Sequence, residues 1–123
     1  MYIVRIVALC CNTTVEDVMS DSRHRSRSAY PRLLSYLFVR VFVPEIKFQQ
    51  IEWIFERKHS TIIVGIDNVV SMLEVRDLVM VTLFNKCRVE LTRGDFDRIN
   101  KLQKELNAIK KRKHERRTST TKR

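Results

Sequence analysis

The side chains best suited to chemistry in this sequence form a short run of hydrogen-bond donors between two apolar segments. Arg57, Lys58, His59, Ser60 and Thr61 follow one another where one helical apolar pattern ends and the next begins. Donors at the start of a helix point outward from its tip, which is where helix-turn-helix proteins contact base edges and phosphates. The run therefore predicts contact with DNA.

A second basic segment, the loop predicted over residues 21–27 and the start of the helix after it, lies earlier in the chain. Its four arginines fall within ten residues, a density that suits either a solvated basic surface or phosphate contacts. Because it would adjoin the helix-turn-helix, phosphate contact is the favoured interpretation. The predicted DNA-binding side chains are Arg23, Arg25, Arg27, Arg32, Arg57, Lys58, His59, Ser60 and Thr61.

Other reactive side chains show no catalytic or metal-binding spacing. The three histidines, His24, His59 and His114, lie in basic surroundings that suit phosphate binding better than general-base catalysis. The three cysteines, at positions 10, 11 and 87, have apolar neighbours and no C-x-x-C or Cys/His spacing. They are expected to be buried, reduced thiols of a cytoplasmic protein. We expect no enzyme activity, no metal and no cofactor.

Composition and charge describe a folded domain with a basic end. At 123 residues, 44% hydrophobic and 31% charged, the chain can hold one core. Of the net charge of +10, the first 109 residues carry only +3, because residues 110–123 hold eight basic side chains and one acidic one. Such a tail suits a polyanion such as nucleic acid, or is a solvated end without a partner. The apolar stretch over residues 3–11 is too short for a bilayer, so no membrane partner is expected.

The elements that would position these side chains are predicted to be helices. Two glycines and two prolines are too few for the tight turns of a β-rich fold. Apolar spacing predicts an all-α chain with Thr13, Ser28 and Ser60 as helix N-caps and Pro44 as a helix stop. Trp53 is expected to pack under a short helix. The predicted helices cover residues 2–10, 15–19, 28–42, 47–55, 60–73, 77–87 (where a strand is the alternative) and 96–109.

The last predicted helix carries a coiled-coil seam. Its apolar positions Ile99, Leu102, Leu106 and Ile109 are spaced 3, 4 and 3 residues apart, a seam of about two heptads. The seam either docks on its own domain or pairs two copies of the chain as a homodimer. The chain divides into a helix-turn-helix domain over residues 1–93, a C-terminal helix over 94–113 and a disordered basic tail over 114–123.

Together these segments resemble the C-terminal DNA-binding domain of DnaA, the bacterial chromosomal replication initiator. Residues 15–20 (VEDVMS) resemble its first helix, and residues 22–28 (SRHRSRS) resemble its basic loop. Residues 31–37 (PRLLSYL) resemble its long helix, and 51–55 (IEWIF) its short helix. The run RKHSTII at 57–63 resembles the family's G-G-R-D-H-[ST]-T-V signature. The resemblance covers roughly residues 1–75.

This resemblance implies that the chain recognises a short duplex box with a helix in the major groove. His59 and Thr61 would face bases, Arg57 and Ser60 would contact phosphate or base, and Arg23 or Arg25 would enter the minor groove. Lys58 departs from the pattern, since it stands where the family has an acidic residue and cannot accept a hydrogen bond. The family's own box sequence is therefore not expected.

We therefore predict a double-stranded DNA-binding protein with sequence preference, a replication or transcription accessory factor of bacterial or phage type. No G-x-x-x-x-G-K-[ST] loop is present, so no ATPase activity is expected. Two alternatives stay open. One is a non-catalytic protein-interaction module that uses the C-terminal helix, and the other is RNA binding through the basic tail.

Overall fold

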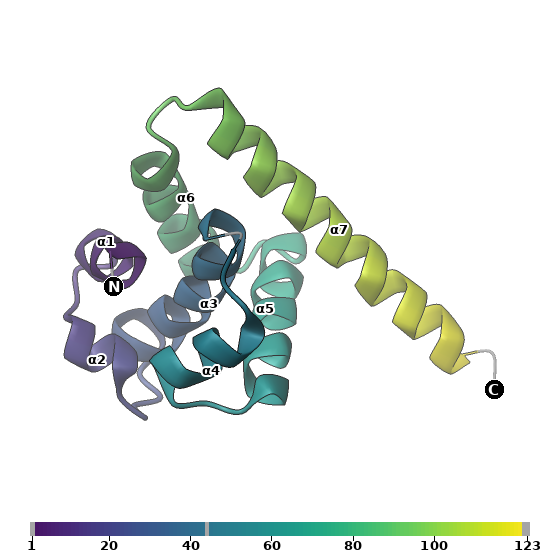
Figure 1. Ribbon diagram of the computed structural model, residues 1–123, viewed down its shortest axis with the longest axis horizontal. Coiled ribbons are helices and arrows are strands. Elements are labelled where there is room, and N and C mark those ends of the chain that lie inside the picture. The colour runs from purple at the N-terminus through teal and green to yellow at the C-terminus, as the bar shows by residue number, and fades with distance from the viewer. Residues whose placement is uncertain (1, 44, 122–123) are drawn as a thin grey trace.

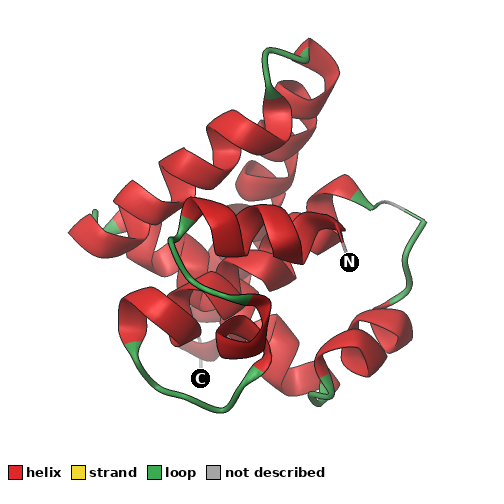
Figure 2. Ribbon diagram, turned by 90° about the vertical axis from the view of Figure 1, so that its left-hand side faces the viewer, coloured by secondary structure: helices red, strands yellow, loops and turns green. Residues whose placement is uncertain are grey.

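The computed structural model describes residues 2–43 and 45–121, with side chains as far as Glu115. Its described residues are helical, with short loops and no strand, which confirms the all-α prediction (Figures 1 and 2). Residues 77–87, where a strand was the alternative, lie in and just before a helix. Pro44, the predicted helix stop, lies outside the described residues. The elements are α1 (Tyr2–Cys10), α2 (Val15–Met19), a π-helical turn η1 (Arg25–Ala29), α3 (Tyr30–Phe42), α4 (Phe48–Phe55), α5 (His59–Glu74), α6 (Leu78–Thr92) and α7 (Phe96–Thr121).

The core is built around α3, which contacts α1, α4, α5, α6 and α7. Its apolar residues lie at helical spacing, and Leu34, Leu37 and Phe38 are completely buried. The Phe38 ring stacks on the ring of Phe84 in α6, with 5.6 Å between centroids. The central helix thus fixes the positions of the helices around it.

Close packing of α5 on α3 depends on Gly65. A Cβ atom at this position would lie 2.9 Å from Leu33 Cδ2 and 2.9 Å from Tyr36 Cδ2. Tyr36 is 1% exposed, and its ring also packs edge-on against Phe55 of α4, with centroids 4.8 Å apart. The ring therefore sets the positions of both α4 and α5.

Three predicted N-caps are wrong. The α2 cap is Thr14, whose hydroxyl accepts a hydrogen bond from the Asp17 N–H, while the Thr13 hydroxyl donates to the Arg27 carbonyl at 2.7 Å. Residues 25–27, predicted as loop, form η1 together with Ser28, the predicted cap, and Ala29, because the N–H groups of Ser28 and Ala29 donate to the His24 carbonyl. Helix α5 begins at His59, one residue before the predicted cap Ser60, because Lys58 is the last extended residue.

Helix α7 differs from the prediction at its C-terminal end. It runs to Thr121, whereas disorder was predicted from residue 114, and only residues 122–123 of that segment lie outside the described chain. Lysine and arginine, which dominate residues 110–117, are good helix formers and can propagate a helix once it is anchored. Figure 1 shows the last turns of α7 extending beyond the other helices.

The seam of α7 docks on its own domain. Leu102, Leu106 and Ile109 are 3%, 9% and 3% exposed, and only Ile99 is partly exposed. Helix α7 contacts α3, α5 and α6. Three of the four residues predicted to pair two copies of the chain are therefore used within one copy.

Four helices end at non-glycine residues in the left-handed conformation. Asn12 follows α1, Glu56 follows α4, Arg76 follows α5 and Arg93 follows α6, with φ between 39° and 58°. The left-handed residue turns the backbone away from the helix axis. These residues produce the short connections between the helices.

Candidate nucleic-acid interface

Helices α4 and α5 follow one another through a short turn. A three-residue turn, Glu56 to Lys58, separates the eight-residue α4 from the sixteen-residue α5. Glu56 adopts the left-handed conformation, and the Arg57 N–H donates to the Glu52 carbonyl at 3.1 Å. The turn thus has a defined backbone geometry, with Phe55 buried immediately before it.

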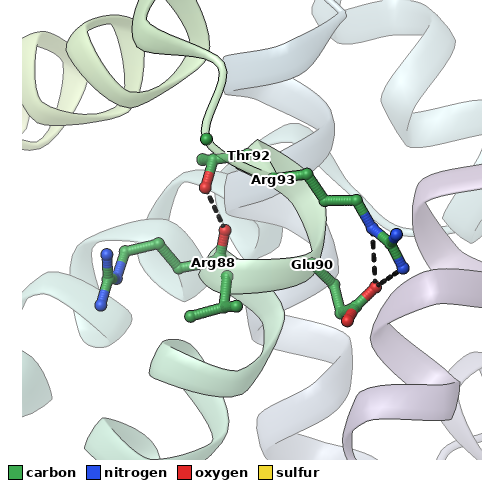
Figure 3. A pocket seen from close by; sticks show the side chains of 6 residues that line it. Arg88, Glu90, Thr92 and Arg93 are labelled. Atoms are coloured by element: carbon green, nitrogen blue, oxygen red, sulfur yellow. Dashed lines mark hydrogen bonds and ion pairs between the residues drawn. The ribbon is translucent and has the colours of Figure 1, made fainter.

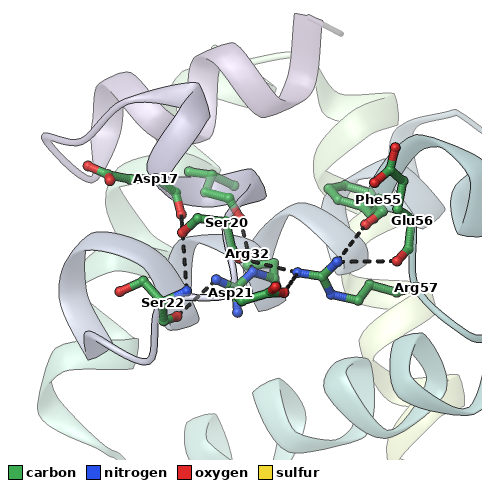
Figure 4. A network of polar contacts seen from close by, with 9 residues as sticks. Asp17, Ser20, Asp21, Ser22, Arg32, Phe55, Glu56 and Arg57 are labelled. Carbon is green, nitrogen blue, oxygen red and sulfur yellow. Dashed lines mark hydrogen bonds and ion pairs between the residues drawn. The ribbon is translucent and has the colours of Figure 1, made fainter.

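Arg57 connects this turn to the loop between α2 and η1. Its guanidinium donates to the carbonyls of Phe55 and Glu56 at 3.1 and 3.2 Å, to the Ser20 carbonyl at 3.2 Å and to Asp21 Oδ1 at 2.6 Å (Figure 4). Only 21% of the side chain is exposed. Arg57 therefore has a positioning role, and its donors are used within the protein rather than held free for DNA.

Arg32 has the same role on α3. Its Nε donates to the Val18 carbonyl at 3.0 Å, and its Nη2 donates to the Ser22 carbonyl at 2.9 Å (Figure 4). Burial lowers the pKa of this guanidinium. Arg32 holds the carbonyls of Val18 and Ser22, and Arg57 holds Ser20 and Asp21 between them, although both arginines were predicted to contact DNA.

The remaining predicted arginines lie in the loop before η1 (Arg23) and in η1 itself (Arg25 and Arg27). Arg23 and Arg25 are exposed. Arg27 is also exposed, and its guanidinium lies 3.8 Å from Asp17 Oδ2. Arg23, in the loop, and Arg25, at the start of η1, are therefore the exposed arginines nearest in sequence to the segment held by Arg32 and Arg57, whereas Arg27 is paired with a carboxylate.

The N-terminal turn of α5 presents the other predicted residues to solvent. Lys58, His59, Ser60 and Thr61 are all exposed, and Lys58 provides no side-chain cap. The first intrahelical bond at this end is from the Ile62 N–H to the Lys58 carbonyl. The preceding N–H groups have no partner within the helix, as at every helix start.

His59 is oriented by α4. Its ring packs edge-on against Phe48, with centroids 4.8 Å apart, and its Nδ1 lies 3.8 Å from Glu52 Oε2. The side chain remains 56% exposed. The ring therefore has a defined position at the tip of α5 and is accessible to a ligand.

Two exposed residues of α5 extend this surface and were missed by the sequence prediction. Val64 is 54% exposed, and Asn68 is also exposed. Spacings of three and four residues place Thr61, Val64 and Asn68 on one face of the helix. The core residues of α5 are Ile62, Ile66, Val69 and Val70, and their helical spacing leaves positions 64 and 68 on the opposite face. The exposure of Val64 and Asn68 could therefore have been predicted from the apolar periodicity.

Trp53 is exposed rather than packed under α4, contrary to the sequence expectation. It is 87% exposed, while Ile51 and Phe55 are buried. Positions 51 and 55 lie on one face of the helix, and position 53 lies on the opposite one. The indole therefore lies on the outer surface of α4.

The far end of α5 is held by the basic segment of α7. Lys113 Nζ donates to the Ser71 hydroxyl and lies 3.4 Å from Glu74 Oε1, and His114 Nε2 lies 3.7 Å from Glu74 Oε2. Desolvation alone would raise the pKa of Glu74, but the hydrogen bond and charge of Lys113, with His114 and Lys110, lower it overall. Part of the basic tail therefore has a structural role that its composition did not reveal.

A separate hollow of about 560 Å³ lies at the turn between α6 and α7 (Figure 3). Arg93 pairs with Glu90 at 2.6 Å, and the Thr92 hydroxyl donates to the Arg88 carbonyl at 2.7 Å. These polar groups use one another as partners. The turn between α6 and α7 lies at the opposite end of the molecule from the turn between α4 and α5 (Figure 1).

Among the described side chains, those of residues 2–43 and 45–115, no group of three or more histidine, cysteine or acidic residues is placed to hold a metal ion. No helix in this part of the chain is long and apolar enough to cross a membrane. Comparison of the chain with protein-family models, curated proteins and solved structures finds no match.

Proposed function

We propose that the protein binds double-stranded DNA with sequence preference through the α4–α5 unit and the loop between α2 and η1. The observation that carries this proposal is the set of Arg57 hydrogen bonds, which joins two exposed basic segments into one surface. Ser20 and Asp21 precede the loop arginines, and Arg57 precedes the tip of α5. The likeness of residues 15–63 to the DnaA DNA-binding domain also supports the proposal.

In the proposed complex, the N-terminal half of α5 enters the major groove. Thr61, Val64 and Asn68 would face base edges, where a valine suits the thymine methyl group and an asparagine suits adenine. His59 and Ser60 would contact bases or phosphates at the tip, and Lys58 a phosphate. Arg23 and Arg25 would contact the backbone or the adjacent minor groove, which accepts arginine.

The first test is selection of bound duplexes from a random pool at roughly 150 mM salt, where nonspecific binding is weak. We expect one enriched motif. His59→Ala or Thr61→Ala should reduce discrimination at one position by about 1–3 kcal/mol, as expected when a side chain that reads a base is removed. Thr82→Ala, at an exposed threonine of α6, is the matched control and should leave the motif unchanged.

The two alternatives predict other results. An interaction module based on α7 predicts no enriched duplex, and loss of a protein partner when Leu102 and Leu106 become polar. The burial of both residues within the chain makes this alternative the weaker one. RNA binding through the tail predicts that hairpins bind as well as duplexes, and that removal of the tail abolishes both. An absence of any motif, together with equal affinity for all duplexes, would contradict sequence-specific reading.

We infer that the protein acts in the cytoplasm as a replication or transcription accessory factor without ATPase activity. The three cysteines are free, which suits a reducing compartment. The sequence contains no phosphate-binding loop of the Walker type.

A further inference from the structure

The three cysteines, far apart in sequence, gather where α1 packs on α6. Cys10 is the last residue of α1, Cys11 follows it, and Cys87 lies in the middle of α6. Cys11 Sγ and Cys87 Sγ are 3.9 Å apart, and the two residues are 7% and 0% exposed. Cys10 is half-buried. The sequence predicts buried thiols at these positions, but it does not predict that two of them are in contact.

We propose that Cys11 and Cys87 are a modification site for hydroperoxides, at which oxidation joins α1 to α6 by a reversible disulfide. The sulfur atoms already touch, so bond formation requires side-chain rotation and a small approach of the two helices rather than their rearrangement. The proposal concerns the thiols alone and is independent of DNA binding.

The surroundings give the two thiols different roles. The hydrogen bond with Cys87 lowers the pKa of Cys11, against the effect of burial, and the charge of Lys86 lowers it further. The same hydrogen bond and burial raise the pKa of Cys87. Cys11 is also the more exposed of the two, at 7% against 0% for Cys87, so it is the sulfur that meets the oxidant and reacts as a thiolate, while Cys87 keeps its proton until the second step.

The reaction balances with hydrogen peroxide as the oxidant. The Cys11 thiolate attacks one peroxide oxygen, the O–O bond breaks, and Cys11 becomes a sulfenic acid while hydroxide takes up a proton and leaves as water. The Cys87 sulfur then attacks the sulfenic sulfur, the S–O bond breaks, and the thiol proton leaves with hydroxide as a second water. Two thiols are oxidised to one disulfide, and one peroxide is reduced to two waters.

Cys10 is the less suitable partner. Burial and the negative charge of Glu90 raise its pKa, which disfavours the thiolate. A bond between the adjacent Cys10 and Cys11 would close a very small ring and distort the intervening peptide. The small exposed fraction of Cys11 also favours a small oxidant over a bulky disulfide such as oxidised glutathione.

The test is peptide mapping of the unmodified 123-residue chain after treatment with hydrogen peroxide and alkylation of the free thiols. Cleavage after glutamate at Glu16, Glu74 and Glu90 releases residues 1–16 and 75–90, which carry the three cysteines. We expect these two peptides to be cross-linked through Cys11 and Cys87, with Cys10 alkylated, and a thiol reductant to separate them. Fragmentation between Cys10 and Cys11 identifies the bonded residue.

Cys10→Ser is the matched control and should give the same cross-link, whereas Cys11→Ala and Cys87→Ala should abolish it. Oxidation should also raise the thermal unfolding midpoint, because the bond links residues 76 positions apart. A cross-link through Cys10, a disulfide between two chains, or cysteines that stay free or pass to sulfinic acid would overturn the proposal. None of these readouts involves nucleic acid, so failure here leaves the DNA proposal unaffected.

Discussion

At the scale of single residues, the basic side chains of the candidate interface fall into two groups. Arg32 and Arg57 use their donors on backbone carbonyls, whereas Arg23 and Arg25 are exposed. Their sequence surroundings are alike, since all four belong to basic, polar segments. What separates them is which carbonyls lie within reach, and this depends on how α2, α3 and α4 pack together. The sequence therefore identified the basic segments but could not separate the arginines that hydrogen-bond within the protein from those that are exposed.

Replacement of Arg57 tests the supporting role. Arg57→Ala removes the donor to three carbonyls and to Asp21, and should destabilise the fold by about 1–3 kcal/mol because polar groups lose their partner. Chemical denaturation measures the change. Arg25→Ala, at an exposed position, should have a free energy of unfolding within about 0.5 kcal/mol of that of the unmodified protein. Equal losses of stability for both variants would show that Arg57 has no special structural role.

Trp53 gives an optical test of the same unit. It is the single tryptophan and is 87% exposed, so its fluorescence in the folded protein should be close to that of tryptophan in water. Iodide should quench it strongly, and unfolding should change the emission wavelength little. A blue-shifted native emission that moves to the red on unfolding would instead place the indole in the core, as the sequence alone suggested.

At the scale of elements, α5 is fixed near both ends by different parts of the chain. The turn before its N-terminus is tied to the loop after α2 by Arg57, and its C-terminal turns are bonded to α7 by Lys113. The helix spans about 24 Å between these ends. Gly65 lets its centre pack closely on α3. A helix held in this way presents its exposed face with little reorientation, which favours binding.

The contact between Glu74 and α7 predicts a dependence of stability on pH. The pKa of Glu74 is lowered in the folded protein, so its ion pairs contribute stability above the ordinary value of 4.5. That contribution is lost as the pH falls through the lowered folded value. Glu74→Gln should therefore be less stable than the unmodified protein at neutral pH and equally stable in acid. Unfolding midpoints at several pH values measure this difference, and a constant difference at all pH values would contradict it.

Because the seam of α7 docks within one chain, substitution of a seam residue should reduce the stability of the monomer. Leu106→Ala should destabilise the fold by about 2–5 kcal/mol, because it leaves a cavity under α7. The unfolding midpoint should not depend on protein concentration. Ile99→Ala, at the partly exposed end of the seam, should reduce the free energy of unfolding by less than Leu106→Ala does. A midpoint that rises with concentration, with a sedimenting dimer, would favour the homodimer.

At the scale of the whole molecule, the last helix carries basic side chains that could bind DNA and also one, Lys113, that stabilises the fold. Removal of residues 116–123 takes away Arg116, Arg117, Lys122 and Arg123 but leaves Lys113 in place. We expect this truncation to leave the unfolding midpoint unchanged and to weaken DNA binding equally for all sequences. The slope of log affinity against log salt should become shallower by about 0.9 for each phosphate that the tail no longer neutralises.

A cut after Ile109 also removes Lys113 and should lower the unfolding midpoint as well. The pair of truncations therefore separates the electrostatic role of the tail from its structural role. An unchanged salt slope after removal of residues 116–123 would show that these residues do not contact the duplex. Equal midpoints for the two truncations would show that Lys113 does not stabilise the docking of α7.

Most of the fold could be predicted from the sequence, because apolar spacing and the scarcity of glycine and proline act locally. The existence of every α-helix and the burial of α3 follow from that pattern. The helix caps were less predictable. Thr13 and Thr14 are the same residue type and differ only in the partner that each hydroxyl reaches, and Lys58 precedes α5 without a side-chain cap. Lys113 was also unpredictable, since its partners are about 40 residues away and α7 had to dock before they met.

The left-handed residues that end α1, α4, α5 and α6 have a consequence for the unfolded chain. Glycine would adopt that conformation with less strain, but it would also leave the unfolded backbone more conformations to lose on folding. With asparagine, glutamate and arginine at these four positions, the denatured ensemble is narrower at the points where the chain must reverse. A helical bundle with only two glycines therefore accepts strain in its folded turns while keeping the entropy of its denatured state low.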